Sequence, residues 1–477
     1  MSWLMVVNLL FYFLTGSRGA QTAGQAYVGL DDDGNLALQP PAGRQLMVNG
    51  VALMKRLADL EALILQQQST MIQQQNTITQ LNATGAAQNS TIAMLTNKLD
   101  HGFSSEVAST LASLRYNLGL LFYGTVRTID STGVVGSYTS LALTTAGFPV
   151  IAYHDGTNQA LKLAVCADTI CSSSIIRNID SAGIVGQYTS LALTTAGFPV
   201  ISYHDGTNDD LKLAVCADAT CSSGTIVRTI DSTDSVGFHT SLALSTAGSP
   251  VISYYDQTNQ DLKVAVCTDA TCSSGATVRT LDSTGDVGWY TSLALTTAGF
   301  PVISFYDNTK GNLKLAVCAD VTCSSGTTIR TIDSAGSVGI YTSLALTTAG
   351  FPVISYFDNI NQDLKLAVCA DATCSAGTTI RTLDSAGNVG SHASLALSTA
   401  GFPIISYYDI TNVDLKLAVC ADATCSSNTT IRTIDSIGNV GSFTSLALTA
   451  AGFPVISYRD GTNSDLKLAV CADATCF

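Results

Sequence analysis

A repeat of about 50 residues that recurs seven times constrains this 477-residue chain more than any other feature. The first cysteines of successive repeats are 50 residues apart once and 51 residues apart thereafter. In one repeat, residues 342–383, four β-rich segments alternate with short turns: TSLALTT, FPVISYFD, DLKLAVC and CSAGTTIRTLD. Four strands joined by short turns predict an antiparallel meander, and a period of this length is typical of the blades of a β-propeller.

The two ends of the repeat region predict how seven blades close into a ring. The last repeat stops at Cys476 and Phe477 without a fourth β-rich segment, whereas an extra copy of that segment, TVRTID at 125–130, precedes the first full repeat. A linear array would leave open edges and normally has atypical capping repeats, which the sequence does not show. We therefore predict an all-β seven-bladed propeller whose N-terminal strand completes the last blade.

All 14 cysteines fall into seven Cys-x-x-x-x-Cys pairs, for which zinc binding and disulfide formation are the competing explanations. A zinc site requires four ligands at other spacings, and no histidine recurs beside these pairs. Local pairing of an even number of cysteines suits an oxidising compartment, so we predict disulfides and no metal site. The pairs are Cys166–Cys171, Cys216–Cys221, Cys267–Cys272, Cys318–Cys323, Cys369–Cys374, Cys420–Cys425 and Cys471–Cys476.

The N-terminus predicts secretion. Its first 20 residues contain an apolar run from Trp3 to Leu14, followed by small and polar residues. Such a run is short for a membrane span and typical of a signal peptide, so residues 1–19 are predicted to be one, with a retained anchor as the alternative. We expect a secreted, extracellular protein without membrane insertion after cleavage. Sequons predict N-glycosylation at Asn82, Asn89 and Asn428.

Apolar residues at heptad spacing predict a coiled-coil stalk before the repeats. Between Leu53 and Leu99 each heptad has two core positions. One is occupied mostly by Leu, Ile and Met, and the other by Leu or Gln. The outer faces are rich in Gln, Thr and Asn, which disfavours a helix packed on its own domain. We expect self-association here, as a trimer rather than a dimer. The expected domains are a short β-rich neck at 20–50, the stalk at 51–100, a connector at 101–124 and the propeller at 125–477.

The repeat resembles those of known propeller proteins. The unit SLALTTAGFPVISY, followed by DLKLAVC, is similar to the repeats of secreted seven-bladed propeller and lectin-like proteins over residues 125–477. Residues 27–100 are similar in style to the neck and stalk of trimeric fibre proteins. The Trp-Asp signature of WD40 blades, the Gly-Gly doublet of kelch blades and the S-x-D-x-G-x-T-W box of sialidase-like blades are missing. The resemblance implies the architecture, while propellers perform many unrelated functions.

The composition of the repeats disfavours catalysis and highly charged partners. Glu61 and Glu106 are the only glutamates in the chain, and nearly every aspartate occupies a repeated position, whereas a glycosidase usually needs a distinct pair of carboxylates. The net charge of −14 disfavours nucleic acid and anionic membranes as partners. We therefore predict a protein that is not an enzyme, with an Asp-dependent glycoside hydrolase as the less favoured alternative.

The turn YHDGTNDDLK at 203–212 contains oxygen ligands of the kind that calcium prefers. Asp205, Asn208 and Asp210 are the candidates. The alternative is that Asp and Asn cap the turn through hydrogen bonds to its backbone. The third position is Ala160 in the first repeat and Asn312 in the fourth, so capping is the favoured interpretation and no cofactor is predicted.

The differences between near-identical repeats are concentrated at three positions. In each repeat, two of these positions directly follow the last glycine of the loop that precedes the first strand. The third position is at the end of the second strand. The connections that carry them are expected on one face of the disc, with Trp289 as a loop residue that blade packing does not need. Drift at tolerant loop positions is the alternative explanation. The predicted ligand-binding residues are Phe238, His239, Trp289, Tyr290, Ile340, Tyr341, Tyr255, Tyr306 and Arg459.

Aromatic rings beside amides and hydroxyls are typical of surfaces that bind sugars or proteins. We therefore expect a binding or adhesion protein whose propeller heads recognise glycans or extracellular proteins. Several heads on one stalk would raise the affinity through multivalency. The alternative from another class is a structural extracellular or fibre component without a small ligand.

Overall fold

The computed structural model describes residues 27–30, 36–39, 47–48, 51–52 and 125–476. The chain divides into two compact units, Met1–Tyr123 and Gly124–Phe477. The predicted signal peptide and connector lie outside the described residues, as do residues 53–100 of the predicted stalk, including Asn82 and Asn89. The first two residues of that stalk, Val51 and Ala52, form a strand. In the part of the chain that is described, no helix is long and apolar enough to cross a membrane.

Two short hairpins occupy the region of the expected neck. β1 (Tyr27–Leu30) pairs antiparallel with β2 (Leu36–Gln39), and β3 (Met47–Val48) pairs antiparallel with β4 (Val51–Ala52). β4 lies just beyond residue 50, where the neck was expected to end.

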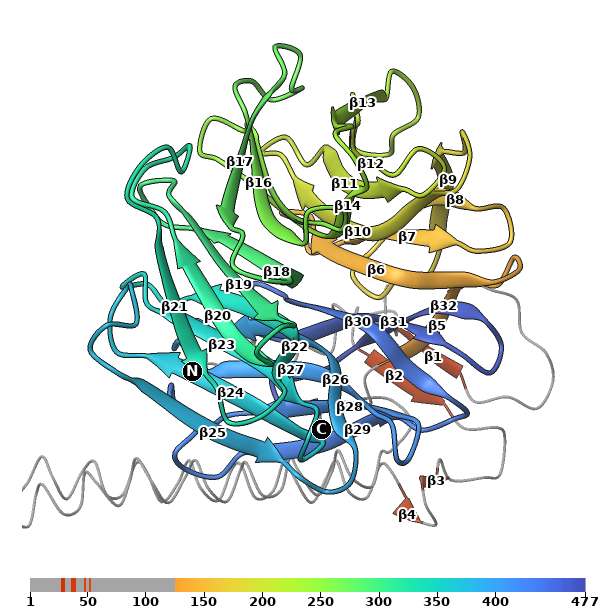
Figure 1. Cartoon of the computed structure of the whole chain (residues 1–477). Helices are drawn as coiled ribbons and strands as arrows, with labels where there is room; N and C mark the ends of the chain where they lie inside the picture. Colours follow the sequence, from red (N-terminus) through yellow and green to blue (C-terminus); the bar gives the residue numbers. More distant parts are fainter. Residues whose placement is uncertain (1–26, 31–35, 40–46, 49–50, 53–124, 477) are drawn as a thin grey trace, which may run out of the picture. The chain divides into compact units, whose positions relative to one another are not determined.

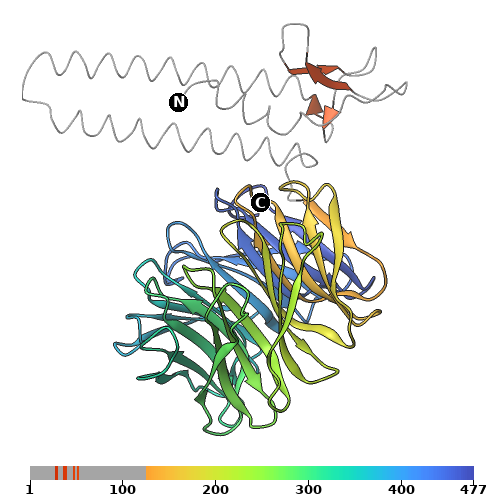
Figure 2. The ribbon, with the colours of Figure 1, turned by 90° about the horizontal axis from the view of Figure 1, so that it is seen from above.

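Within residues 125–476, seven four-stranded antiparallel sheets surround one axis as the blades of a propeller (Figures 1 and 2). Blades 1 to 6 are β6–β9, β10–β13, β14–β17, β18–β21, β22–β25 and β26–β29, and blade 7 consists of β30, β31, β32 and β5. The first strands of neighbouring blades contact one another in a closed circuit, so they line the axis. The predicted seven-bladed propeller is therefore confirmed.

The strand bounds are nearly equivalent in all blades. The axis-lining first strands are β6 (Val135–Leu143), β10 (Val185–Leu193), β14 (Val236–Leu244), β18 (Val287–Leu295), β22 (Val338–Leu346), β26 (Val389–Leu397) and β30 (Val440–Leu448). The second strands are β7 (Pro149–Asp155), β11 (Pro199–Asp205), β15 (Pro250–Asp256), β19 (Pro301–Asp307), β23 (Pro352–Asp358), β27 (Pro403–Asp409) and β31 (Pro454–Asp460). The third strands are β8 (Ala160–Cys166), β12 (Asp210–Val215), β16 (Asp261–Cys267), β20 (Asn312–Val317), β24 (Asp363–Cys369), β28 (Asp414–Val419) and β32 (Asp465–Val470). The outer strands are β9 (Ser174–Asp180), β13 (Ile226–Asp231), β17 (Ala276–Asp282), β21 (Thr328–Asp333), β25 (Thr378–Asp384), β29 (Thr430–Asp435) and β5 (Thr125–Asp130).

The ring closes through β5, as the ends of the repeat region predict. β5 pairs antiparallel with β32, with Arg127 opposite Leu468 and Thr125 opposite Val470. The first strand of blade 1, β6, contacts the first strand of blade 7, β30, and the two lie side by side at the closing junction (Figure 1). The outermost strand of blade 7 thus comes from the N-terminal end of the propeller.

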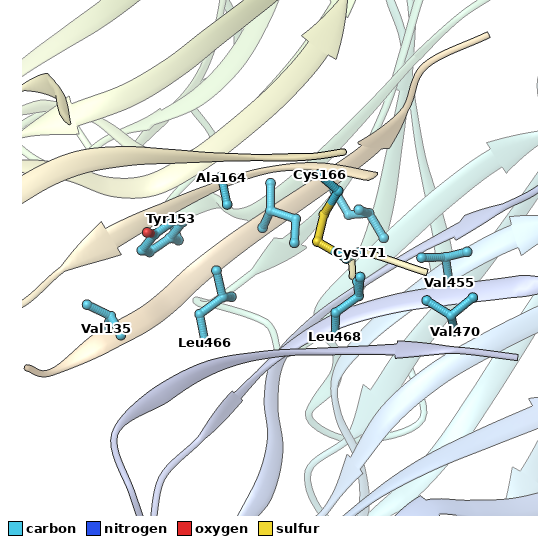
Figure 3. Close-up of a cluster of buried hydrophobic side chains, with 11 residues drawn as sticks. Val135, Tyr153, Ala164, Cys166, Cys171, Val455, Leu466, Leu468 and Val470 are labelled. Carbon is cyan, nitrogen blue, oxygen red and sulfur yellow. A yellow bond between two sulfur atoms is a disulfide. The ribbon is translucent and has the colours of Figure 1, made fainter. Parts of the chain in front are cut away.

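The hydrophobic core is divided among the junctions between neighbouring blades. At the closing junction Val135 and Tyr153 of blade 1 pack with Leu466 and Leu468 of blade 7, and all four are fully buried (Figure 3). Equivalent clusters fill the other junctions of residues 125–476. Because the second and third strands are buried on both faces, their sequences are nearly continuous apolar runs.

The predicted disulfides are confirmed. Within residues 125–476 each Cys-x-x-x-x-Cys pair forms a disulfide with a Cα–Cα distance of 4.8–5.0 Å, and no cysteine is free. In blades 1 to 6 each bond lies across the hairpin between the third and outer strands, and in blade 7 Cys471–Cys476 closes the segment after β32. So small a loop gives only about 2 kcal/mol of stability in the chain-entropy picture. Each disulfide therefore stabilises one local segment of a single blade, and their number fits an oxidising compartment.

Serine side chains join the axis-lining strands of neighbouring blades. In each Ser-Leu-Ala-Leu segment, the N–H of the first leucine donates to the serine Oγ of the preceding blade at 2.9–3.0 Å. The bond from Leu141 to Ser445 closes this circuit between blades 1 and 7. Neighbouring sheets share no backbone ladder in the described propeller, so these bonds explain why the serine is repeated.

A buried lysine between two aspartates locks each blade to the one before it. Lys416 of blade 6 lies 2.8 Å from Asp384, the last residue of blade 5, and 3.4 Å from Asp409 of its own blade. The Tyr407 hydroxyl donates to Asp384 at 2.6 Å. The same arrangement recurs at all junctions within residues 125–476, except that Phe305 replaces the tyrosine in blade 4. The lysines are Lys162, Lys212, Lys263, Lys314, Lys365, Lys416 and Lys467.

A chain that begins at Ser131 lacks β5 and leaves blade 7 with three strands and an exposed edge. It also lacks Asp130, so Lys162 keeps only Asp155 as its counterion. We expect the free energy of unfolding to fall by at least about 3 kcal/mol, because removing one partner from a buried ion pair costs this much by itself. The exposed edge should also promote aggregation. Chemical denaturation compares this chain with one that begins at Gly124, and identical unfolding curves would contradict the closure through β5.

Acid should weaken the junctions. Burial raises the pKa of Asp384, but hydrogen bonds from Lys416, Tyr407 and the Ala386 N–H outweigh burial and hold the pKa below its ordinary value of 3.8. Such a carboxylate contributes stability that is complete above its unfolded pKa and is lost as the pH falls through its folded pKa. We expect the free energy of unfolding to fall below about pH 4, and to fall less steeply in Asp384→Asn. Denaturation at several pH values measures the slope, with the exposed Asp234→Asn as the control; equal slopes in all three proteins would contradict the prediction.

Candidate functional site

One face of the propeller carries both connections that vary between blades. In blade 1 the Val134 N–H donates to Thr157 Oγ1 at 2.7 Å, and the Gly156 N–H donates to the Val134 carbonyl at 2.7 Å. Equivalent bonds from the loop to the turn occur in blades 2, 3, 4, 6 and 7. The loops before the first strands and the turns after the second strands therefore share one face, as predicted. We call it the variable face.

The variable residues lie within the first strand rather than in the loop before it. β18 begins at Val287, so Trp289 and Tyr290 are its third and fourth residues, and Trp289 pairs with Tyr306. The register shifts on both sides of Trp289, which marks a β-bulge. The expectation that Trp289 is a loop residue is therefore wrong. The bulge interrupts the alternation on which strands are recognised in a sequence, so the strand was expected to begin four residues later.

Seven aromatic side chains, one from each blade, form a closed ring around the axis. The centroids of neighbouring members are 4.3–4.8 Å apart, including the Phe443–Tyr138 pair that joins blades 7 and 1. Most neighbouring planes are tilted, which suits the quadrupoles of aromatic rings. We call this set the aromatic ring; all its members are half-buried. They are Tyr138, Tyr188, His239, Tyr290, Tyr341, His392 and Phe443.

The backbone holds the aromatic ring in an unusual conformation. All seven members have φ between 52° and 55°, which is uncommon for bulky residues. Gly288, two residues before Tyr290, has φ 102°, and an added Cβ would lie 2.8 Å from the Leu262 Cα of the preceding blade. The Thr291 hydroxyl donates to the carbonyl of His239 in the preceding blade at 2.8 Å. The surrounding structure thus fixes a strained backbone, and strain of this kind is concentrated at functional sites.

The aromatic ring is uncharged at neutral pH. Burial lowers the pKa of His239 to about 3, and the nearby His204 contributes to this decrease. Burial also lowers the pKa of His392 to about 4, so both imidazoles are neutral. Burial raises the pKa of Tyr188 and Tyr290 above the ordinary value of 10, so their hydroxyls stay protonated. A molecule at the aromatic ring meets carbon surfaces, hydroxyls and neutral ring nitrogens.

Trp289 belongs to a packed cluster at the junction between blades 3 and 4. Its ring lies 5.1 Å from the ring of Tyr255, and its Nε1–H donates to Asp286 Oδ1 at 2.7 Å. The Tyr255 hydroxyl donates to the same oxygen at 2.7 Å, and Asn308 Nδ2 donates to Asp286 Oδ2 at 2.7 Å. Tyr255 is buried, whereas Trp289 keeps part of its surface exposed. Trp289 therefore both packs and reaches the variable face.

In several blades, the variable residue near the end of the second strand forms a hydrogen bond with the next blade. The hydroxyls of Tyr255, Tyr306 and Tyr408 bond to the residue before the next first strand, respectively Asp286, Ser337 and Asn439. The third residue of that strand, Trp289, packs on Tyr255, whereas the third residue beside Tyr408 is Ser442. Tyr255 and Tyr306 are thus buried and engaged with protein groups.

The other predicted residues are distributed between the aromatic ring and the junctions. His239, Tyr290 and Tyr341 are members of the aromatic ring. Phe238 stacks on His204 with their centroids 4.1 Å apart, and Ile340 pairs with Phe357. The remaining predicted residue is Arg459, which is half-buried and lies opposite Ser442 in β30.

Several site residues were missed from the sequence. Tyr138, Tyr188, His392 and Phe443 complete the aromatic ring, and Asp286 organises the Trp289 cluster. The available signal was an aromatic residue or histidine at the same position of every repeat. Nothing in that pattern indicates that the seven side chains touch, because the contact depends on the bulge and on closure of the ring.

The candidate calcium turn is capped by its own side chains. Asp205 Oδ1 accepts from the N–H groups of Thr207 and Asn208 at 3.0 and 3.2 Å, and Oδ2 accepts from Asn208 Nδ2 at 3.0 Å. Lys212 also lies 3.5 Å from Asp205 Oδ2. These bonds are the capping arrangement that the sequence favours. Among the described residues, no group of three or more His, Cys, Asp or Glu could hold a metal ion. The sequon residue Asn428 is exposed in the loop after Cys425.

Among known proteins, only solved structures are similar to this chain. No family model matches the chain, and no curated protein matches it. A polysaccharide lyase, ulvan lyase, is 9% identical, with a TM-score of 0.47 over 74% of this chain and 95% of that chain. An α-L-arabinofuranosidase from Fusarium graminearum is 10% identical, with a TM-score of 0.42 over 59% and 92%. The SapL1 lectin, in complex with α-methyl fucoside, is 11% identical, with a TM-score of 0.42 over 63% and 97%. Identities this low bear on the fold alone.

Replacing Trp289 with Ala should destabilise the propeller. We expect a loss of about 1–3 kcal/mol, below the cost for a fully buried tryptophan, because the indole is half-buried. Trp289→Phe keeps the contact with Tyr255 but loses the bond to Asp286, and should cost about 0.5–1.5 kcal/mol. The control is Val321→Ala, an exposed residue on the opposite face of the same blade, which should change stability by less than about 0.5 kcal/mol. Chemical denaturation measures all three, and a Trp289→Ala protein as stable as the wild type would restore the loop interpretation.

Proposed function

We propose that this protein is a secreted, non-enzymatic binding protein whose variable face recognises glycans. The observation that carries the proposal is the closed aromatic ring, seven side chains fixed in a strained backbone around the axis. Aromatic carbon surfaces beside hydroxyl groups match the alternating apolar and polar surfaces of sugars.

The groups around the aromatic ring supply the polar part of such a site. Gln187, Ser137 and Ser442 precede their aromatic neighbours in blades 2, 1 and 7, and all three are partly exposed. The aromatic ring itself is uncharged, so hydrogen bonds and apolar contact would dominate recognition there. Few fixed polar groups around an apolar patch are typical of sites that bind small ligands specifically.

The aspartates that cap the turns and hold the junctions do not favour the Asp-dependent hydrolase, whereas burial raises the pKa of Asp210 and of its equivalents at the start of other third strands. Asp205 caps its turn, and Asp384 holds Lys416 and Tyr407 at a junction. A catalytic pair needs one carboxyl group with a raised pKa beside the substrate, whereas the pKa of Asp384 is lowered by its partners despite its burial. These carboxylates stabilise the fold.

Self-association through residues 51–100 is the second part of the proposal. Each head would bind a glycan weakly, and several heads on one stalk would bind a surface more tightly by raising the effective concentration. The heptad pattern of the sequence supports this part.

The full-length protein and its isolated head, residues 124–477, should both bind on a glycan array. We expect at least about 100-fold tighter apparent binding by the full-length protein because of avidity. Trp289→Ala should weaken binding by about 1–3 kcal/mol if its exposed surface contacts the sugar, relative to Val321→Ala on the opposite face. An array without signal for either protein would overturn the proposal. A protein-array signal in its place would favour an extracellular protein as the partner, and no signal on either array would favour a structural component.

A further inference from the structure

The second-strand variable position of blade 7 carries a positive charge. Arg459 occupies the place of Tyr255, Tyr306 and Tyr408 in other blades. It is half-buried, and its Nε atom is inaccessible to solvent and makes no hydrogen bond. Among the described residues Arg459 has neither an ion pair nor a hydrogen bond. The Nε atoms of Arg127 and Arg177 on outer strands are likewise buried without a hydrogen bond, whereas Arg228 donates from Nε to the Thr271 carbonyl at 2.8 Å.

The next blade does not provide the acceptor that it provides elsewhere. The equivalent tyrosines bond to Asp286, Ser337 and Asn439. Blade 1 follows blade 7 in the closed ring, since the Val135 N–H donates to the Ser464 carbonyl at 2.8 Å. The residue of blade 1 at the acceptor position is Val134, whose side chain cannot accept a hydrogen bond.

The next blade also does not cover Arg459 with a ring. Phe238 stacks on His204, and Trp289 packs on Tyr255, in each case from the third residue of the following first strand. The corresponding residue beside Arg459 is Ser137 of blade 1. A serine is too short to cover a guanidinium group, and Arg459 keeps part of its surface exposed.

A partly buried charge without a counterion is unfavourable in a folded protein. The guanidinium group presents its N–H donors as a rigid fork that matches the two oxygens of a carboxylate or a sulfate ester. The chain carries a net charge of −14, so its overall field repels anions and only a local contact could attract one.

We propose that Arg459 is an oxyanion-recognition residue of the variable face, and that the preferred glycans carry a carboxylate or a sulfate ester. The oxyanion would lie between blades 7 and 1, where Val134 and Ser137 leave the guanidinium without a protein partner. That the oxyanion belongs to a sugar rests on the proposed function. That Arg459 binds an oxyanion rests on the residues at the junction between blades 7 and 1.

Calorimetry on the full-length protein tests the glycan class with three tetrasaccharides: oligoglucuronate, an O-6-sulfated galactan and a neutral glucan. We expect one acidic tetrasaccharide to bind at least about tenfold more tightly than the neutral one, as befits a charge-assisted bidentate bond. Arg459→Gln should abolish this preference, and Arg459→Lys, which keeps the charge but not the fork, should retain part of it. Arg330→Gln, at an exposed outer-strand arginine, is the matched control and should bind like the wild type. Equal binding of acidic and neutral sugars, no binding of either acidic sugar, or an unchanged Arg459→Gln would overturn the glycan preference.

A second measurement separates the oxyanion site from the proposed function. Phenylglyoxal modifies accessible arginines, and mass spectrometry reports the rate at Arg459 and at Arg330 in the same sample. Free glucuronate or sulfate should slow labelling of Arg459 at least about threefold, while glucose should not, and Arg330 should label at the same rate throughout. Protection together with an empty glycan array would leave the oxyanion site standing and overturn the proposed function. No protection by either anion would overturn the oxyanion site.

Discussion

The antiparallel pairing of β5 with β32 places the two ends of the propeller in one sheet, and the other features of the ring require this pairing. It brings Asp130 to Lys162 and Tyr153 of blade 1, so the seventh junction has the same buried ion pairs as the other six described junctions. It also brings Phe443 to Tyr138, so the aromatic ring has no gap. Without the β5–β32 pairing, blade 7 would expose an unpaired edge and blade 1 would lack half of its junction.

The stability of the propeller and the proposed recognition depend on the same junctions between blades. The lysine–aspartate pairs, the serine bonds between first strands and the apolar clusters all join one blade to the next. The residues of the variable face use the same neighbours: Tyr255 of blade 3 bonds to Asp286 before blade 4, and Thr291 of blade 4 bonds to the carbonyl of His239. Substitutions on the variable face should therefore affect stability as well as the proposed binding, and the Trp289 cluster is an example.

The repeat made the architecture predictable, because seven copies of one meander leave few ways to bury their apolar faces. The missing last strand and the extra first one similarly predicted the closure, and the cysteine spacing predicted the disulfides. The candidate site was predicted less well. Trp289 was expected in a loop because a β-bulge removes the alternation from its strand, and the contacts of Tyr138 with Phe443 join residues that are 305 positions apart. Contacts across a closing ring have no signature in local sequence.

The bonding of Tyr255 by Asp286 and its covering by Trp289 also bear on how this protein could change its specificity. The second-strand residue belongs to one repeat, whereas its acceptor and its cover belong to the next. The unit of recognition is therefore offset from the unit of duplication. Copying a whole repeat to a new place in the chain would preserve a blade and its disulfide but would give its variable residue a new acceptor and a new cover. Rearrangement of intact repeats could thus place each second-strand residue beside a new acceptor and a new covering residue without any point mutation, while the fold stays the same.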